Sequence, residues 1–154
     1  MSGMTRRLLL SCGVLSCGVL ALPDARAQSG GVWVVTGPEA ALPPSPNSKA
    51  GRSITRGPAI RQVSPAAAVA PNQPFALKVE FAGRGGEKVN PVSAQIMVLR
   101  GNNVDITQRL KPYITANGIE IPNAMVPAGT YVLQVAVSDA GGRQSTANIE
   151  IEAR

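Results

Sequence analysis

The sequence predicts an all-β fold, a sandwich of two antiparallel sheets with about seven strands over residues 58–154. Short runs of alternating apolar and polar residues recur along this part of the chain, separated by Gly, Pro and Asn. Glycine and proline are abundant, at 16 and 13 of 154 residues, as a fold with many turns requires. No run with the spacing of an amphipathic helix competes with these strands.

The strand patterns follow one another at short intervals. The clearest is 130–138, where Tyr131, Leu133 and Val135 alternate with more polar residues. Asn117 and Gly118 form a hairpin signal, and a loop is expected between Pro122 and Pro127. One helical turn is expected at 108–113. The expected strands are 58–64, 75–81, 92–99, 104–107, two pieces within 114–121, 130–138 and 144–152.

The inward-facing residues of these strands provide a sufficient core. Burial of each such side chain contributes roughly 1.5–3 kcal/mol before conformational entropy is subtracted. The expected core residues are Phe75, Leu77, Val79, Phe81, Ile96, Val98, Tyr131, Leu133, Val135, Val137, Ile149 and Ile151.

The run 127–143 resembles the penultimate strand and final hairpin of bacterial immunoglobulin-like or fibronectin type III-like domains. A Pro/Gly turn leads into the strand with Tyr131, and Asp139 opens the turn into the last strand. Residues 60–65 are similar to the first strand of these domains. The resemblance covers about 58–154 and implies a single immunoglobulin-like antiparallel β-sandwich, without implying an activity. The Cys pair and core Trp of antibody-type domains are missing.

Residues 1–27 are typical of a secretory signal peptide. Arg6 and Arg7 form the basic start, residues 8–22 form the apolar region, and cleavage is expected after Ala27. The apolar region is shorter than the about 20 residues of a membrane span, so no stable span is expected after cleavage. The signal predicts a periplasmic or secreted protein.

Two alternatives for export stay open. Residues 5–10 resemble a twin-arginine signal, which would export a folded protein, although the apolar region favours the general route. Cys17 follows a weak lipobox, and processing there would give a lipid anchor. Because Cys12 and Cys17 are the two cysteines of the chain, the mature protein would contain none.

Residues 28–57 are predicted to be a Pro/Gly-rich linker. Four prolines within residues 38–46 favour a disordered spacer of the polyproline type. The short apolar segment 32–35 has two interpretations. It is either an N-terminal strand on an edge of this domain, or a donor strand that adds to the sheet edge of another protein.

The residue types present argue against an enzyme. The chain has no histidine, and the mature part has no cysteine, so the commonest general base and the usual zinc and copper ligands are missing. Glu150 and Glu152 share one wet strand face and are expected to be solvated. Asp105 and Asp139 are expected to cap turns, with a low-affinity calcium site as the alternative. We therefore expect no catalytic, cofactor-binding or metal-binding residues and no cofactor.

The charge of the chain does not indicate a nucleic-acid site. The net charge is +6, and removal of residues 1–27 takes away three arginines and one aspartate and leaves +4. The basic runs 84–88 and 109–111 are expected to be solubility features.

Together these features predict an exported, non-enzymatic binding or structural module of the cell envelope, whose partner is an unknown envelope protein or polymer. The alternative is a polysaccharide-binding β-sandwich module. Trp33 and Tyr113 are the mature aromatic residues outside the expected core. They are therefore the candidate partner contacts.

Overall fold

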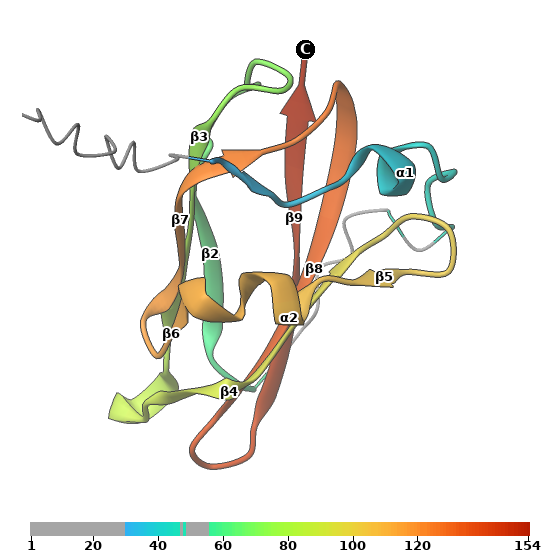
Figure 1. Ribbon diagram of the computed structural model, residues 1–154. Helices are drawn as coiled ribbons and strands as arrows, with labels where there is room; N and C mark the ends of the chain where they lie inside the picture. The colour runs from blue at the N-terminus through green and yellow to red at the C-terminus, as the bar shows by residue number, and fades with distance from the viewer. Residues whose placement is uncertain (1–29, 47, 49–55) are drawn as a thin grey trace, which may run out of the picture.

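The computed structural model describes residues 30–46, 48 and 56–154, and within them two β-sheets pack face to face as a sandwich (Figure 1). The predicted fold class is confirmed. The predicted signal peptide, with Cys17, lies outside the described residues. Among the described residues, no helix is long and apolar enough to cross a membrane.

The first sheet has the strand order β1-β7-β3-β2, and β6 also pairs with β7. Every pair is antiparallel except β1 with β7, which run parallel. The strands of this sheet are β1 (Val32–Trp33), β2 (Ala59–Ser64), β3 (Phe75–Ala82), β6 (Ile114–Thr115) and β7 (Gly118–Met125).

The second sheet has the order β5-β4-β8-β9 and is antiparallel throughout. Strands β8 and β9 keep an unbroken register from Gly129 opposite Ala153 to Ser138 opposite Gln144. This long hairpin is the most regular part of the fold, as its alternating sequence predicts. The strands are β4 (Val89–Val98), β5 (Val104–Asp105), β8 (Gly129–Asp139) and β9 (Gln144–Ala153).

Short helices join the strands. The expected helical turn is present as α2 (Thr107–Leu110) followed by η2 (Lys111–Tyr113), and Leu110 anchors it in the core. Two further turns, α1 (Gly37–Ala40) and η1 (Arg84–Gly86), were not expected as helices. Both α1 and α2 are single turns, so contacts with the sandwich hold them.

The core lies between the sheets and contains the predicted side chains. All of the expected core residues are buried except Phe75, which is partly buried and packs against the cluster. Other buried side chains come from outside the predicted core: Val34, Val35, Val89, Leu99, Ile106, Leu110, Ile119, Ile121, Ala124 and Val126. Of these, Val34 and Val35 come from the predicted linker, and both are 0 % exposed.

The prediction of a disordered spacer is wrong for residues 30–46, which we call the N-terminal arm. The arm lies across the sandwich, with β1 on the first sheet and α1 beyond it (Figure 1). Its prolines occupy positions that suit them. Pro38 stands in the first turn of α1, where no amide donor is needed. Pro43 uses only its carbonyl, which accepts a hydrogen bond from the Gly101 amide at 2.8 Å.

The loop expected between Pro122 and Pro127 is shorter than predicted, because β7 continues through Pro122 to Met125. The pairing of β7 with β3 is irregular between Ile121 and Ala124, so this stretch makes fewer ladder hydrogen bonds. A strand tolerates proline where its ladder is interrupted in this way.

We expect Val35→Ala to lower the free energy of unfolding by about 2 kcal/mol, because it removes buried methyl groups and leaves a cavity. Urea unfolding of the mature protein measures the change. Val92→Ala is the matched control, since Val92 is 86 % exposed. Equal stability of the two variants would mean that the arm does not belong to the core.

Candidate functional site

The N-terminal arm begins by covering an edge of the first sheet. Trp33 of β1 lies opposite Met125 of β7, and the amide of Val34 donates to the Met125 carbonyl at 3.0 Å. Val34 and Val35 then enter the core. Of the two interpretations of segment 32–35, the structure shows the strand on the edge of its own domain.

Arg109 of α2 holds the middle of the arm. Its Nη1 donates to the carbonyls of Val34 at 3.1 Å and Trp33 at 3.4 Å. The same guanidinium contacts both carboxylate oxygens of Glu39, with Nη2 to Oε1 at 2.6 Å and Nη1 to Oε2 at 3.0 Å. A bidentate arginine–carboxylate pair is among the stronger charged contacts in proteins. Arg109 therefore binds the arm and is more than the solubility feature that the sequence predicted.

Arg100 holds the end of the arm. Its Nη1 donates to the carbonyls of Leu42 at 2.9 Å and Ala40 at 3.2 Å, and its Nη2 donates to the Thr130 carbonyl at 2.7 Å. The guanidinium carbon also lies 4.9 Å from the centre of the Tyr131 ring. One arginine thus connects the arm to the start of β8.

The ion pair controls the titration of Glu39. The pKa of the Glu39 carboxyl is lowered to about 2, mainly by the hydrogen bonds from Arg109, against the opposing effect of burial, and with smaller contributions from the backbone amide and hydroxyl of Thr36. In turn, the Glu39 carboxylate raises the pKa of Arg109. The amide of Thr36 donates to Oε2 of Glu39 at 2.8 Å, so this carboxylate also closes the first turn of α1.

Sequence reasoning missed Glu39 although a local signal was present. Thr36 and Glu39 have the spacing of a helix start, with a threonine followed three residues later by glutamate and with Pro38 between them. The partner Arg109 is 70 positions away, so no local pattern connects the two residues.

The two predicted partner contacts lie in separate places. Trp33 is 38 % exposed on β1, whereas Tyr113 is partly buried at the end of η2 and packs against the core. Along β7, Trp33 lies beside Met125, and Ile114, next to Tyr113, lies beside Ile119. Six residues of strand span roughly 20 Å, so the structure does not bring the two rings into one platform.

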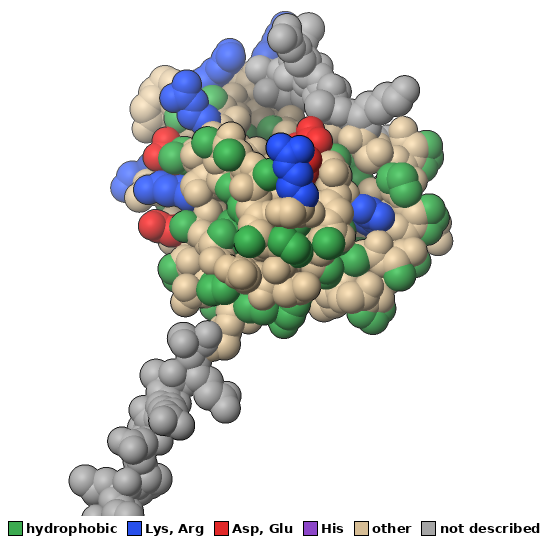
Figure 2. All heavy atoms as spheres, turned by 90° about the horizontal axis from the view of Figure 1, so that it is seen from above, with side chains coloured by type: hydrophobic (Ala, Val, Ile, Leu, Met, Phe, Trp, Pro, Cys, Tyr) green, Lys and Arg blue, Asp and Glu red, His purple; other side chains and the backbone are tan. Residues whose placement is uncertain are grey.

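The arm gives the molecule an uncharged surface. Glu39 is the one charged residue in the arm, and Arg109 pairs with it. Seen from above in Figure 2, charged side chains lie on one half of the molecule. The half toward the viewer of Figure 1, where β1 and α1 run in front, shows hydrophobic and uncharged polar atoms. Trp33 and Leu42 are the exposed large apolar residues of the arm.

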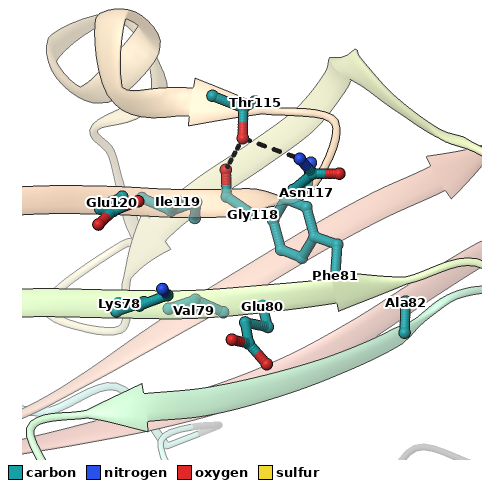
Figure 3. Close-up of a pocket in the computed structure, with 10 residues that line it drawn as sticks. All are labelled: Lys78, Val79, Glu80, Phe81, Ala82, Thr115, Asn117, Gly118, Ile119 and Glu120. Carbon is teal, nitrogen blue, oxygen red and sulfur yellow. Dashed lines mark hydrogen bonds between the residues drawn. The ribbon is translucent and has the colours of Figure 1, made fainter.

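A concave surface lies where β3, β6 and β7 meet (Figure 3). This hollow of about 410 Å³ is lined by Lys78, Glu80 and Glu120, with Lys78 directly opposite Glu120 on the neighbouring strand. The Thr115 hydroxyl, also in the lining, donates to the Gly118 carbonyl at 3.0 Å and closes the β6–β7 turn. The charges are mixed and the hollow is open, so it does not create a distinctive electrostatic environment.

Gly118 is required at the base of this hollow. Its φ of +149° is in the region that favours glycine, and a Cβ there would overlap the carbonyl of Val79. A side chain at this position would therefore force β3 and β7 apart.

The predicted turn-capping roles of Asp105 and Asp139 are confirmed. Asp105 accepts from the Thr107 amide at 2.8 Å, and the hydrogen bonds from Thr107 lower its pKa. Asp139, buried at the end of β8, accepts hydrogen bonds from the Arg143 amide at 2.9 Å and from the Arg143 Nε at 2.8 Å. The hydrogen bond from the amide is the main cause of the lowered pKa of Asp139. Within the described ranges, no three His, Cys, Asp or Glu residues come together as a metal site.

Comparisons with known proteins give no family for the chain. No family model matches it, and no curated protein matches it. Among solved structures, the chain is similar to CopC from Methylosinus trichosporium OB3b, with a TM-score of 0.40 and 19 % sequence identity. This similarity covers 62 % of this chain and 93 % of that chain. We draw no argument about function from a similarity this distant.

We expect acid to weaken the attachment of the arm between about pH 4.5, the ordinary pKa of glutamate, and about pH 2, the pKa of Glu39. A carboxyl with a lowered pKa stabilises the fold above the unfolded pKa, and this contribution is lost as the pH falls through the folded pKa. The fluorescence of Trp33, the single tryptophan of the chain, reports the release. Glu39→Gln is expected to remove most of this pH dependence. An identical acid profile for wild type and Glu39→Gln would contradict the role of the ion pair.

Proposed function

We propose that this chain is an exported, non-enzymatic binding or structural module of the cell envelope. The observation that carries the proposal is that the indole of Trp33 is exposed while the backbone that bears it is fixed on the sandwich. The next two residues are fully buried, and the carbonyls of Trp33 and Val34 accept hydrogen bonds from Arg109. Tryptophan is a frequent anchor of protein interfaces, and a rigid support reduces the entropy lost on binding.

The strand order supports an immunoglobulin-like or fibronectin type III-like domain. Strands β2, β3 and β7 form one sheet in the order of strands A, B and E of such domains, and β4, β8 and β9 form the other in the order C, F and G. Near the start of β8, the Tyr131 hydroxyl donates to the Ala128 carbonyl at 3.0 Å. A tyrosine at the start of strand F that bonds back to the backbone is a hallmark of the immunoglobulin fold.

The position of strand D in that fold is taken here by two short strands, β6 and β1. Strand D normally covers the outer edge of strand E. In this chain β6 pairs with β7 only at Gly118 and Ile119, and β1 from the N-terminal arm pairs with β7 at Ala124 and Met125. Two short strands thus share the edge that strand D covers, and β1 presents Trp33 there.

The titratable groups support a role other than catalysis. Within the part of the chain that the structure describes, the carboxyls with lowered pKa are Glu39, Asp105 and Asp139. The first two hold a helical turn and a loop, and the third closes the β8–β9 turn. Their interactions stabilise the fold and keep these carboxylates ionised, which is unsuited to general acid catalysis near neutral pH.

The export part of the proposal rests on residues 1–27, whose pattern predicts a signal removed after Ala27. The mature protein would then be periplasmic or secreted. Its partner would be an envelope protein or polymer that buries an aromatic side chain.

Pull-down from an envelope extract tests the proposal. We expect the mature wild-type protein to capture a partner and Trp33→Ala to reduce that capture at least tenfold, as loss of an aromatic anchor does. Val92→Ala, which changes an exposed residue of β4, should capture as wild type does. Urea unfolding of each variant establishes that the arm and sandwich remain folded.

A glycan array with wild type and Tyr113→Ala distinguishes the polysaccharide-binding alternative. Glycan binding that Tyr113→Ala abolishes and Trp33→Ala leaves intact would favour that alternative. Capture of no partner by any variant would contradict the binding role.

A further inference from the structure

We propose that the end of the sandwich opposite the C-terminus binds an anionic membrane surface. We call it the basic end and define it by Arg56, Arg84, Lys88 and Arg143. These residues come from three stretches of chain: the residues before β2, the β3–β4 loop and the β8–β9 turn, at the lower end of the view in Figure 1. This role rests on the proposed location in the cell envelope and is independent of the surface that Trp33 presents.

The β3–β4 loop holds two of these cations in a small space. A Cβ on Gly83 would overlap the carbonyl of Glu87, so the two sides of the loop are in contact. The amide of Glu87 also donates to the Arg84 carbonyl at 3.3 Å and closes the turn η1. Arg84 and Lys88, which adjoin the touching residues, are therefore held within one short loop.

The other two cations are brought to this loop from distant parts of the sequence. The amide of Ala140 donates to the Lys88 carbonyl at 3.0 Å, so the β8–β9 turn, which contains Arg143, lies against the β3–β4 loop. A Cβ on Gly57 would overlap the backbone of Arg143, so the chain that enters β2 passes the same turn. Arg56 immediately precedes this contact, and the fold thus places all four cations at one end.

Three of the four cations have no ionic partner. Among the described residues, Arg56, Arg84 and Lys88 are exposed and make no ion pair, whereas Arg143 pairs with the buried Asp139. Glu87 is the other acidic residue of the three stretches. Four basic and two acidic residues leave a net charge of +2 at the basic end. The described residues together carry ten Lys or Arg and eight Asp or Glu, so this end accounts for their whole net charge.

Charges elsewhere on the described surface balance one another. Two ion pairs join arm to sandwich and the last residues of β9, and two further pairs of opposite charge face each other across neighbouring strands: Glu39 with Arg109, Glu152 with Arg154, Lys78 with Glu120 and Arg61 with Glu80. The four remaining charged residues are two of each sign: Arg100, Lys111, Asp105 and Glu150. The positive potential of the described molecule is therefore strongest at the basic end.

A membrane is the anionic partner that suits this arrangement. The three unpaired cations are exposed on separate stretches at one end, so they can approach a flat surface together. A single polymer chain would instead need them aligned along a groove. Each cation that approaches an anionic bilayer raises the affinity about fivefold, and the attraction acts within a Debye length of about 8 Å.

The basic end and the Trp33 surface lie at opposite ends of the sandwich. Strand β3 begins at Phe75, whose partner Ala124 also pairs with Val32 of β1, and it ends at Ala82, beside the β3–β4 loop. Eight residues of strand span roughly 25 Å. A molecule that rests on a membrane by its basic end therefore presents Trp33 away from the lipid.

Sedimentation of the mature protein with vesicles tests the proposal. The anionic probe is a vesicle of equal parts phosphatidylglycerol and phosphatidylcholine, and the neutral probe is a vesicle of phosphatidylcholine alone. We expect the wild type to bind the anionic vesicles and to dissociate in about 1 M salt, where the Debye length is about 3 Å. The triple variant Arg56→Gln, Arg84→Gln, Lys88→Gln should bind at least tenfold more weakly.

The matched control is the triple variant Lys78→Gln, Lys111→Gln, Arg154→Gln. It removes the same charge from β3, η2 and the C-terminus, away from the basic end, and should bind within about twofold of wild type. Urea unfolding of both triple variants establishes that they are folded.

Three results would overturn the proposal. One is equal binding of the wild type to anionic and neutral vesicles, and another is equal loss of binding in the two triple variants. The third is tighter binding to alginate, an anionic polysaccharide, than to anionic vesicles at the same concentration of charge, which would assign the basic end to a polymer. Each of these results leaves capture of a partner through Trp33 standing, and failure of that capture leaves vesicle binding standing.

Discussion

The contact between Arg109 and Glu39 is the interaction on which the N-terminal arm depends. One guanidinium joins three pieces of chain: the carbonyls that end β1, the carboxylate that closes α1, and the helical turn α2 on the sandwich. The pair is partly shielded from solvent, with the Glu39 side chain 14 % exposed. It therefore contributes more than a freely exposed ion pair. Its bonds to Trp33 and Val34 hold the arm where those residues leave the sheet.

The N-terminal arm covers part of an exposed strand edge of this sandwich. Strand β6 is only two residues long and leaves much of the outer edge of β7 without a partner. An open strand edge invites pairing with other chains. Strand β1 covers the far end of that edge, and Pro122, which has no amide hydrogen, stands between the two covered ends. Strand β1 thus has two roles, because it covers part of the β7 edge and also presents Trp33 to solvent.

The sandwich could be predicted from sequence because its strands are long enough to show a period of two. Tyr131, Leu133 and Val135 alternate so regularly that both the strand and its buried face follow. The arm could not be predicted in the same way. Val34 and Val35 are too few to show a period, and the prolines near them are equally typical of a disordered chain. The contacts that decide the outcome join residues far apart in the sequence. Of the predicted contact residues, Trp33 is exposed and Tyr113 is partly buried. The distance between them is set by where β1 and β6 pair along β7, which the sequence does not reveal.

The central claim is that the N-terminal arm is part of the folded unit, and hydrogen exchange at the Val34 amide tests it most directly. This amide bonds to the Met125 carbonyl at 3.0 Å and belongs to a residue that is fully buried. The structure predicts that it exchanges at least a hundredfold more slowly than in an unfolded chain, and faster in Arg109→Gln than in wild type. Exchange at the rate of an unfolded chain, while the amides of β8 stay protected, would contradict the account.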